Sequence, residues 1–219
     1  MNRWAKPLSL LPLALAACGG LFQTKARPPI MYQLTAAAVA APAVTPAAAP
    51  SGAPAVAPIS ADLAVLKPRV RTGLATDRIA ALYPDRRLEY FADARWSGPL
   101  DEVIQDMAVQ EFHLAAGLRN VSAEESEFPS AYWLEIEVTD FQAEYAAAAA
   151  PTVRVHFLAR IGNSADRRIL AQFEASAMES AADNRLSAIV AAYNRAADKA
   201  LAEIVAGTNL ALRTHVRPD

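Results

Sequence analysis

The chain has 219 residues, 53% of them hydrophobic, and its formal net charge at neutral pH is −2. That length suits one domain with a substantial core. The 21 basic residues are scattered along the chain, which argues against a nucleic-acid partner. The single cysteine, Cys18, excludes an internal disulfide and a thiolate metal site.

The first part of the chain is typical of a secretory signal peptide. Arg3 and Lys6 make a positive start, residues 8–16 are mainly apolar, and small residues lead to Cys18. The apolar run is too short to span a bilayer, and no later run is long enough. We therefore expect residues 1–17 to be removed as a signal peptide, which changes the net charge from −2 to −4.

The motif Leu15-Ala16-Ala17-Cys18 resembles the bacterial lipobox, in which the cysteine carries diacylglycerol and acyl lipid and becomes the first mature residue. Each buried lipid methylene contributes about 0.8 kcal/mol, so several acyl chains hold a protein at a membrane. We expect lipidation at Cys18 and no other cofactor. Gly19 replaces the aspartate that retains enteric lipoproteins at the inner membrane, which favours the outer membrane of a Gram-negative bacterium, facing the periplasm. The alternative is a plain secretory signal with an incidental thiol.

The mature chain changes composition twice before it becomes globular. Residues 31–35 alternate in polarity like a short strand, whereas the stretch that follows is almost wholly Ala, Pro and Val. If the short strand were disordered, the whole span to Ile59 would be tether. We expect a lipidated tether over residues 18–29, the first strand of the domain over 30–35, a flexible Ala/Pro-rich loop over 36–59, the globular domain over 60–212 and a tail over 213–219.

Hydrophobic patterns predict the elements of the globular region. Strands are expected at residues 63–66, 79–83, 87–92, 132–138, 141–145, 153–161 and 169–175. The pattern slips at Thr139, which predicts a bulge. A helix is expected to begin with Ser97 as its cap and Pro99 in its first turn, and to end at Gly117. A longer helix is expected to start at Asp183.

Short connections between the later strands favour antiparallel neighbours. On the final helix, Tyr193 lies in an apolar stripe, and Lys199 and Glu203 are expected to pair on the outer face. The sequence therefore predicts an α+β single domain, a mainly antiparallel sheet packed on one face by two helices.

No catalytic or metal-binding pattern stands out. The histidines, His113, His156 and His215, have no partner at the spacing of metal ligands. Glu135 and Glu137 share one strand face, an arrangement compatible with paired catalytic carboxylates, but a solvated strand face explains them better. The chain is predicted not to be an enzyme.

Aromatic and basic residues cluster in RRLEYFADARW, residues 86–96. Such a cluster suits a lipid-headgroup reader or a docking edge, because Trp, Tyr and Arg are favoured at interfaces. The competing interpretation is a hairpin with solvated arginines and aromatics packed under the following helix. The cluster comprises Arg86, Arg87, Tyr90, Phe91, Arg95 and Trp96.

The order of short motifs resembles the ABC-type transport auxiliary lipoprotein family, which includes the PqiC-like lipoproteins that accompany MCE-domain lipid transporters. The lipobox is followed by a short strand with the pattern YxL at residues 32–34. The motif LEY then occurs at residues 88–90, and ARWSGPLDEVI at residues 94–104. The resemblance covers essentially the whole mature chain, and the family uses the YxL tripeptide as its first strand. The signature residues, structural or docking, are Tyr32, Leu34, Arg95, Trp96, Pro99 and Leu100.

The resemblance implies a non-catalytic, outer-membrane lipoprotein that serves an ABC system moving lipids between membranes. Its partners would be an MCE-domain protein with the ABC permease and ATPase, and a homo-oligomer would suit docking on a symmetric partner. The alternative is a structural assembly lipoprotein, a pilotin or chaperone of a secretion or pilus machine. A periplasmic hydrolase and a soluble lipid carrier are disfavoured, because neither a nucleophile with a base nor an enclosed cavity is indicated.

Overall fold

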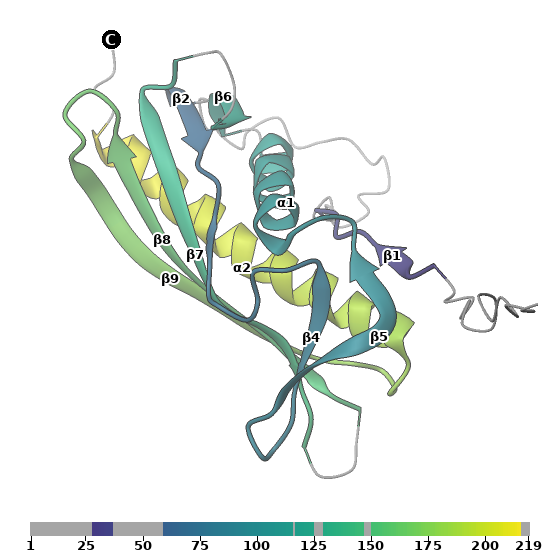
Figure 1. The fold of residues 1–219 in the computed structure, drawn as a ribbon. Helices are drawn as coiled ribbons and strands as arrows, with labels where there is room; N and C mark the ends of the chain where they lie inside the picture. Colours follow the sequence, from purple (N-terminus) through teal and green to yellow (C-terminus); the bar gives the residue numbers. More distant parts are fainter. Residues whose placement is uncertain (1–27, 37–58, 116, 125–128, 147–149, 216–219) are drawn as a thin grey trace, which may run out of the picture.

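The structure, a computed structural model, describes residues 28–36, 59–115, 117–124, 129–146 and 150–215 (Figure 1). The elements in chain order are β1 (Ile30–Tyr32), β2 (Ile59–Val65), β3 (Arg69–Val70), β4 (Arg78–Leu82), β5 (Leu88–Trp96), α1 (Leu100–Ala115), β6 (Leu118–Ala123), β7 (Tyr132–Glu144), β8 (Thr152–Asn163), β9 (Ile169–Ser180) and α2 (Leu186–His215).

Strand β7 organises the sheet, because both of its edges are paired over most of its length. Along one edge it runs antiparallel to β8, which in turn runs antiparallel to β9. The other edge is shared by three shorter strands, β2, β3 and β4, all parallel to β7. Strand β5 continues the sheet beyond β4, and β1 pairs with β5 in parallel register.

The predicted fold class is confirmed: the chain is an α+β single domain whose mixed, largely antiparallel sheet carries two helices. Helix α2 crosses the sheet diagonally, and α1 packs beside it (Figure 1). The expected bulge is also present, because the β7–β8 register shifts between Val138 and Asp140.

Alternation along the long strands explains which side of the sheet is buried. Leu134, Ile136 and Val138 of β7 have no exposed surface, while the residues between them are half-buried on the other face. The buried face meets α2, whose apolar stripe includes the fully buried Tyr193 and Leu201. The predicted stripe is therefore the face of α2 in the core.

Several elements differ from the sequence expectation at their ends. Strand β2 begins at Ile59, one residue before the expected start of the domain, because the Ile59 N–H donates to the Gly117 carbonyl at 2.9 Å. Helix α2 begins at Leu186 rather than Asp183. Strands β3 and β6 were not predicted: β3 has two residues, and in β6 only Val121 is buried, so neither shows clear alternation. Lys199 forms its ion pair with Glu179 of β9, not with Glu203.

Candidate functional site

The signature residues meet where β1, β5 and the start of α1 come together. Tyr32 of β1 lies opposite Trp96 of β5 in the parallel pair. The Ser97 N–H donates to the Tyr32 carbonyl at 2.8 Å, and the Trp96 N–H donates to the Asp77 carbonyl at 2.7 Å. Backbone hydrogen bonds therefore fix the N-terminal strand to the segment that leads into α1.

Trp96 is a core residue, with 1% of its surface exposed. Its ring meets Tyr193 edge-on at 5.2 Å and Phe141 at 5.9 Å between centroids. The Tyr193 hydroxyl donates to the Ala80 carbonyl, and complete burial raises the pKa of Tyr193 well above its usual value. This aromatic cluster joins β5, β7 and α2 in one core.

The other signature positions have equally local contacts. The Arg95 guanidinium pairs with the Asp77 carboxylate at 2.6 Å, within the turn that precedes β4. Leu100 is buried, and its N–H donates to the Thr76 carbonyl at 3.2 Å. Pro99 is exposed at the helix start, where its missing N–H is tolerated. These contacts position the β5–α1 junction.

The segment after β1 is held against both helices. Leu34 is buried, and Asn194 of α2 forms two hydrogen bonds with the Thr35 backbone, each of 2.9 Å. The Ala36 N–H donates to Gln110 Oε1 of α1 at 3.4 Å. The side-chain amide of Asn194 thus pairs with Thr35 as a neighbouring strand would. Cys18, the expected signal peptide and nearly all of the expected Ala/Pro-rich loop lie outside the described residues.

The cluster in residues 86–96 does not form one surface. Arg87 pairs with Asp85 and Glu89, both on the same hairpin. Arg95 and Trp96 have the contacts given above. Tyr90 donates its hydroxyl to the Gly73 carbonyl at 2.6 Å and lies under the Arg78 guanidinium. Phe91 packs against the core. Arg86 is the exception in this cluster, because its exposed guanidinium has no hydrogen bond or ion pair to any described residue.

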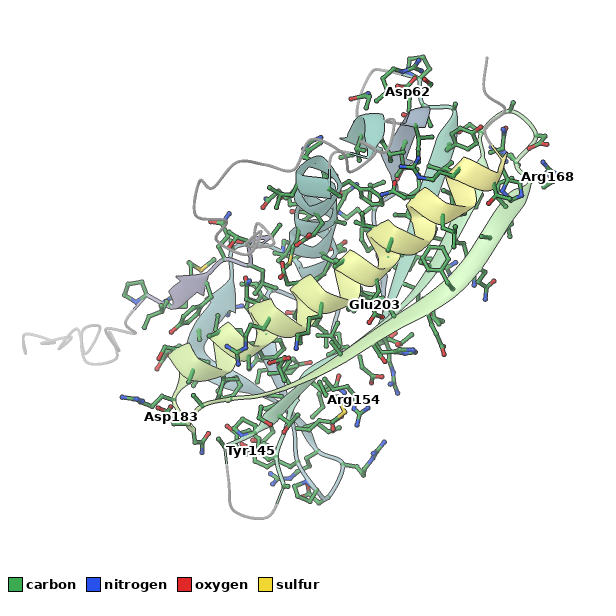
Figure 2. All side chains as sticks on the ribbon, turned by 180° about the vertical axis from the view of Figure 1, so that it is seen from behind. Asp62, Tyr145, Arg154, Arg168, Asp183 and Glu203 are labelled. Carbon is green, nitrogen blue, oxygen red and sulfur yellow. The ribbon has the colours of Figure 1, made fainter. Side chains whose placement is uncertain are left out.

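Arg86 lines a groove of about 560 Å³ where the β4–β5 hairpin meets the ends of β7 and β8. We call it the arginine groove, and its charged lining residues are Arg71, Arg86, Arg154, Asp140 and Glu144. Arg71, between β3 and β4, is also exposed and has no side-chain partner among the described residues. Figure 2 shows Arg154 and Tyr145 at this end of the sheet.

The wall formed by β7 and β8 is already internally paired. Glu144 accepts hydrogen bonds from Arg154 Nε at 2.8 Å and from Gln142 Nε2 at 3.2 Å. The same Gln142 Nε2 donates to Asp140 at 3.1 Å. Tyr145 stacks on Tyr83 at 5.1 Å between centroids, and burial raises its pKa. Arg71 and Arg86 are therefore the two arginines of the arginine groove that have no side-chain partner among the described residues.

A second groove, of about 410 Å³, separates the C-terminal halves of α1 and α2. We call it the helical groove. It is lined mainly by apolar residues, together with Glu111 and Asn209. Only 5% of the Glu111 surface is exposed. This burial is the larger cause, and the neighbouring Asp198 the smaller cause, of a pKa raised to about 8. Glu111 Oε1 and Asn209 Oδ1 are buried without a hydrogen-bond partner in the described part of the chain.

The histidines and Glu135 have structural partners. His113 contacts the Val121 carbonyl, and His215 contacts the Ala211 carbonyl. His156 lies 3.5 Å from Glu174 and 3.9 Å from Asp140, neighbours that its sequence context did not reveal.

Glu135 accepts a hydrogen bond from Arg160 at 3.2 Å on the solvent-facing side of the sheet, where Glu137 is also half-buried. Within the described ranges no group of three or more His, Cys, Asp or Glu is arranged to hold a metal ion. No helix among those ranges combines the length and apolar character needed to cross a bilayer.

Solved structures share this fold. A crystal structure of a Xanthomonas campestris protein from the family DUF330 is 23% identical, covers 84% of this chain and 97% of its own, and superposes with a TM-score of 0.71. An uncharacterised protein of solved structure, 13% identical, covers 84% of this chain and 97% of its own with a TM-score of 0.58. A hypothetical protein from Chlamydia trachomatis is 13% identical, and the match covers 71% of this chain and 99% of its own with a TM-score of 0.50. These likenesses concern the fold.

Sequence comparison identifies the family. The sequence profile described as the ABC-type transport auxiliary lipoprotein component matches residues 32–205. The match begins at Tyr32 and includes the β1–β5 junction, the sheet and most of α2. This chain therefore belongs to the ABC-type transport auxiliary lipoprotein family, as its motif order predicted. No curated protein matches it in sequence.

Proposed function

We propose that the protein is a non-catalytic lipoprotein, anchored through lipid on Cys18 to the outer membrane of a Gram-negative bacterium and facing the periplasm. There it serves as an accessory subunit of an MCE-type ABC system that moves lipids between membranes. The observation that carries the proposal is the family match over residues 32–205, preceded by a lipobox. The proposed partners are the MCE-domain protein, the permease and the ATPase.

The geometry of the N-terminal segment supports an anchored role. Residues 19–29 separate Cys18 from β1, and a stretch of that length reaches at most about 40 Å when fully extended. The hydrogen bonds of Tyr32 and Thr35 hold the end of this tether in the domain. A lipid on Cys18 would therefore keep the domain close to its membrane.

The non-catalytic assignment is supported by what the polar side chains contact. The paired candidates Glu135 and Glu137 lie on a sheet face where Arg160 and Arg69 neutralise Glu135. Glu144 and Asp140 share the Gln142 amide. These carboxylates act as hydrogen-bond acceptors within the wall of the sheet, which suits binding and scaffolding.

A genetic comparison tests the proposal. Deletion of this protein, deletion of the associated permease, and deletion of both should change the lipid composition of the purified outer membrane in the same way and to the same extent. The Cys18→Ser variant should reproduce the deletion, while Arg167→Gln, an exposed turn substitution, should restore the wild-type composition. Additive defects in the double deletion would contradict a shared pathway.

A further inference from the structure

The arginine groove contains two cations whose charges the fold does not use. Arg71 and Arg86 come from different turns, and neither guanidinium has a hydrogen bond or an ion pair with a described residue. Most other arginines have such partners: Arg87, Arg95, Arg154 and Arg195 each form an ion pair within the fold. Like charges that face one groove repel each other, so a bound anion would stabilise the pair.

The opposite wall offers acceptors and an aromatic surface. Three arginines and two acidic residues line the groove, which gives its lining a net positive charge, although the expected mature chain is acidic. Asp140 and Glu144 are held in place by Gln142, so a donor group of a ligand could reach their remaining lone pairs. The stacked rings of Tyr83 and Tyr145 add a flat apolar side.

We propose that the arginine groove binds a phosphate group, with Arg71 and Arg86 as its ligands and with an adjacent amine or hydroxyl of the same molecule directed at Asp140 and Glu144. Guanidinium groups favour phosphate because their planar donors match two phosphate oxygens at once. The shared chemistry is that of a phospholipid headgroup and of a free phosphorylated metabolite. The inference does not rest on the transport role, because no transport partner is needed for binding.

Calorimetric titration of the full chain in nonionic detergent tests the proposal. The probes are inorganic phosphate, O-phosphoethanolamine, and detergent micelles that contain phosphatidylethanolamine; micelles containing diacylglycerol lack phosphate and serve as the blank. The Arg71→Gln/Arg86→Gln variant and both single variants are compared with the wild type. Loss of a charge-assisted hydrogen bond weakens binding about tenfold, so each single variant should lose about that much affinity.

Arg167→Gln provides a matched control. Arg167 lies at the tip of the β8–β9 turn with a positive φ of 54°, as Arg86 does in the β4–β5 turn with a φ of 69°, but it is remote from the groove. Its affinity should equal that of the wild type, and all variants should share one thermal unfolding midpoint.

Binding of O-phosphoethanolamine or inorganic phosphate would support a phosphate site open to soluble ligands. Binding of the phospholipid micelles alone would support a headgroup site. Failure of every phosphate probe to bind the wild type would overturn the proposal. Equal affinities of the wild type and both single variants for the phosphate probes would also overturn it. So would a loss of affinity in Arg167→Gln as large as the loss in Arg86→Gln.

Discussion

Glu111 should make the stability of this domain fall as pH rises, and Glu111→Gln should remove that dependence. The carboxyl group is 95% buried between α1 and α2, one of its oxygens has no hydrogen-bond partner in the described residues, and Asp198 of α2 lies close enough to couple to it. Burial is the largest cause of the raised pKa, and Asp198 adds to it.

The sign follows from the direction of the shift. The pKa of Glu111 rises from an ordinary 4.5 to about 8 in the folded chain, so the folded state retains a proton that the unfolded state loses between these values. Stability is therefore greatest below about pH 4.5 for this group and declines as pH rises to about 8. At about 1.4 kcal/mol per pKa unit the full shift corresponds to about 5 kcal/mol. Solvent in the helical groove, which Glu111 lines, reduces the expected effect to about 2 kcal/mol.

Urea denaturation of the wild type and Glu111→Gln at pH 5 and pH 9 measures this effect. Glutamine keeps the shape of the protonated acid but cannot ionise, so the variant should match the wild type at pH 5 and exceed its free energy of unfolding by about 2 kcal/mol at pH 9. Glu203→Gln, on the exposed face of α2, should leave the free energy of unfolding within about 0.5 kcal/mol of the wild type at both pH values. An equal difference between wild type and Glu111→Gln at pH 5 and pH 9 would refute the reasoning.

Three further substitutions test the packing that supports the site. Trp96→Ala should lower the free energy of unfolding by about 3–5 kcal/mol in urea titrations, because it empties the centre of the aromatic cluster; a loss below about 1 kcal/mol would place Trp96 outside the core. Gly162→Ala should cost about 1–3 kcal/mol, because the new methyl group would lie 2.2 Å from the Trp133 ring, and the same change in a Trp133→Ala background should cost much less. Asn194→Ala removes both hydrogen bonds to Thr35 and should speed amide exchange in residues 30–36 by about tenfold or more, read by mass spectrometry. Unchanged exchange there would show that β1 pairing alone holds the segment.

Local patterns were sufficient to predict the long elements. The three long strands β7, β8 and β9 each alternate over many residues, and their short connections leave few ways to pair. The stripe on α2 was visible because it repeats over several helical turns. Trp96 and Leu100 were identified by motif, and the structure gives them core positions.

Contacts between distant segments could not be predicted from such patterns. The edge of β7 is shared by three short strands in parallel, and a two-residue strand such as β3 has no periodicity to detect. Lys199 pairs with Glu179 because β9 lies beside α2, whereas helical spacing indicated Glu203. Only part of the arginine groove could be predicted. Arg86 belongs to the basic cluster in the sequence, whereas Arg71 lies outside that cluster in the sequence and is brought to the same groove by the fold.

Affinity purification of the cross-linked, tagged protein from detergent-solubilised membranes, read by mass spectrometry, tests the proposed function most directly. The wild type should recover an MCE-domain protein together with its permease and ATPase, and Cys18→Ser should recover far less of all three. Recovery of a secretin or pilus component in their place would contradict the transport role and favour an assembly lipoprotein. Equal recovery of the transporter by both forms would contradict the need for the lipid anchor.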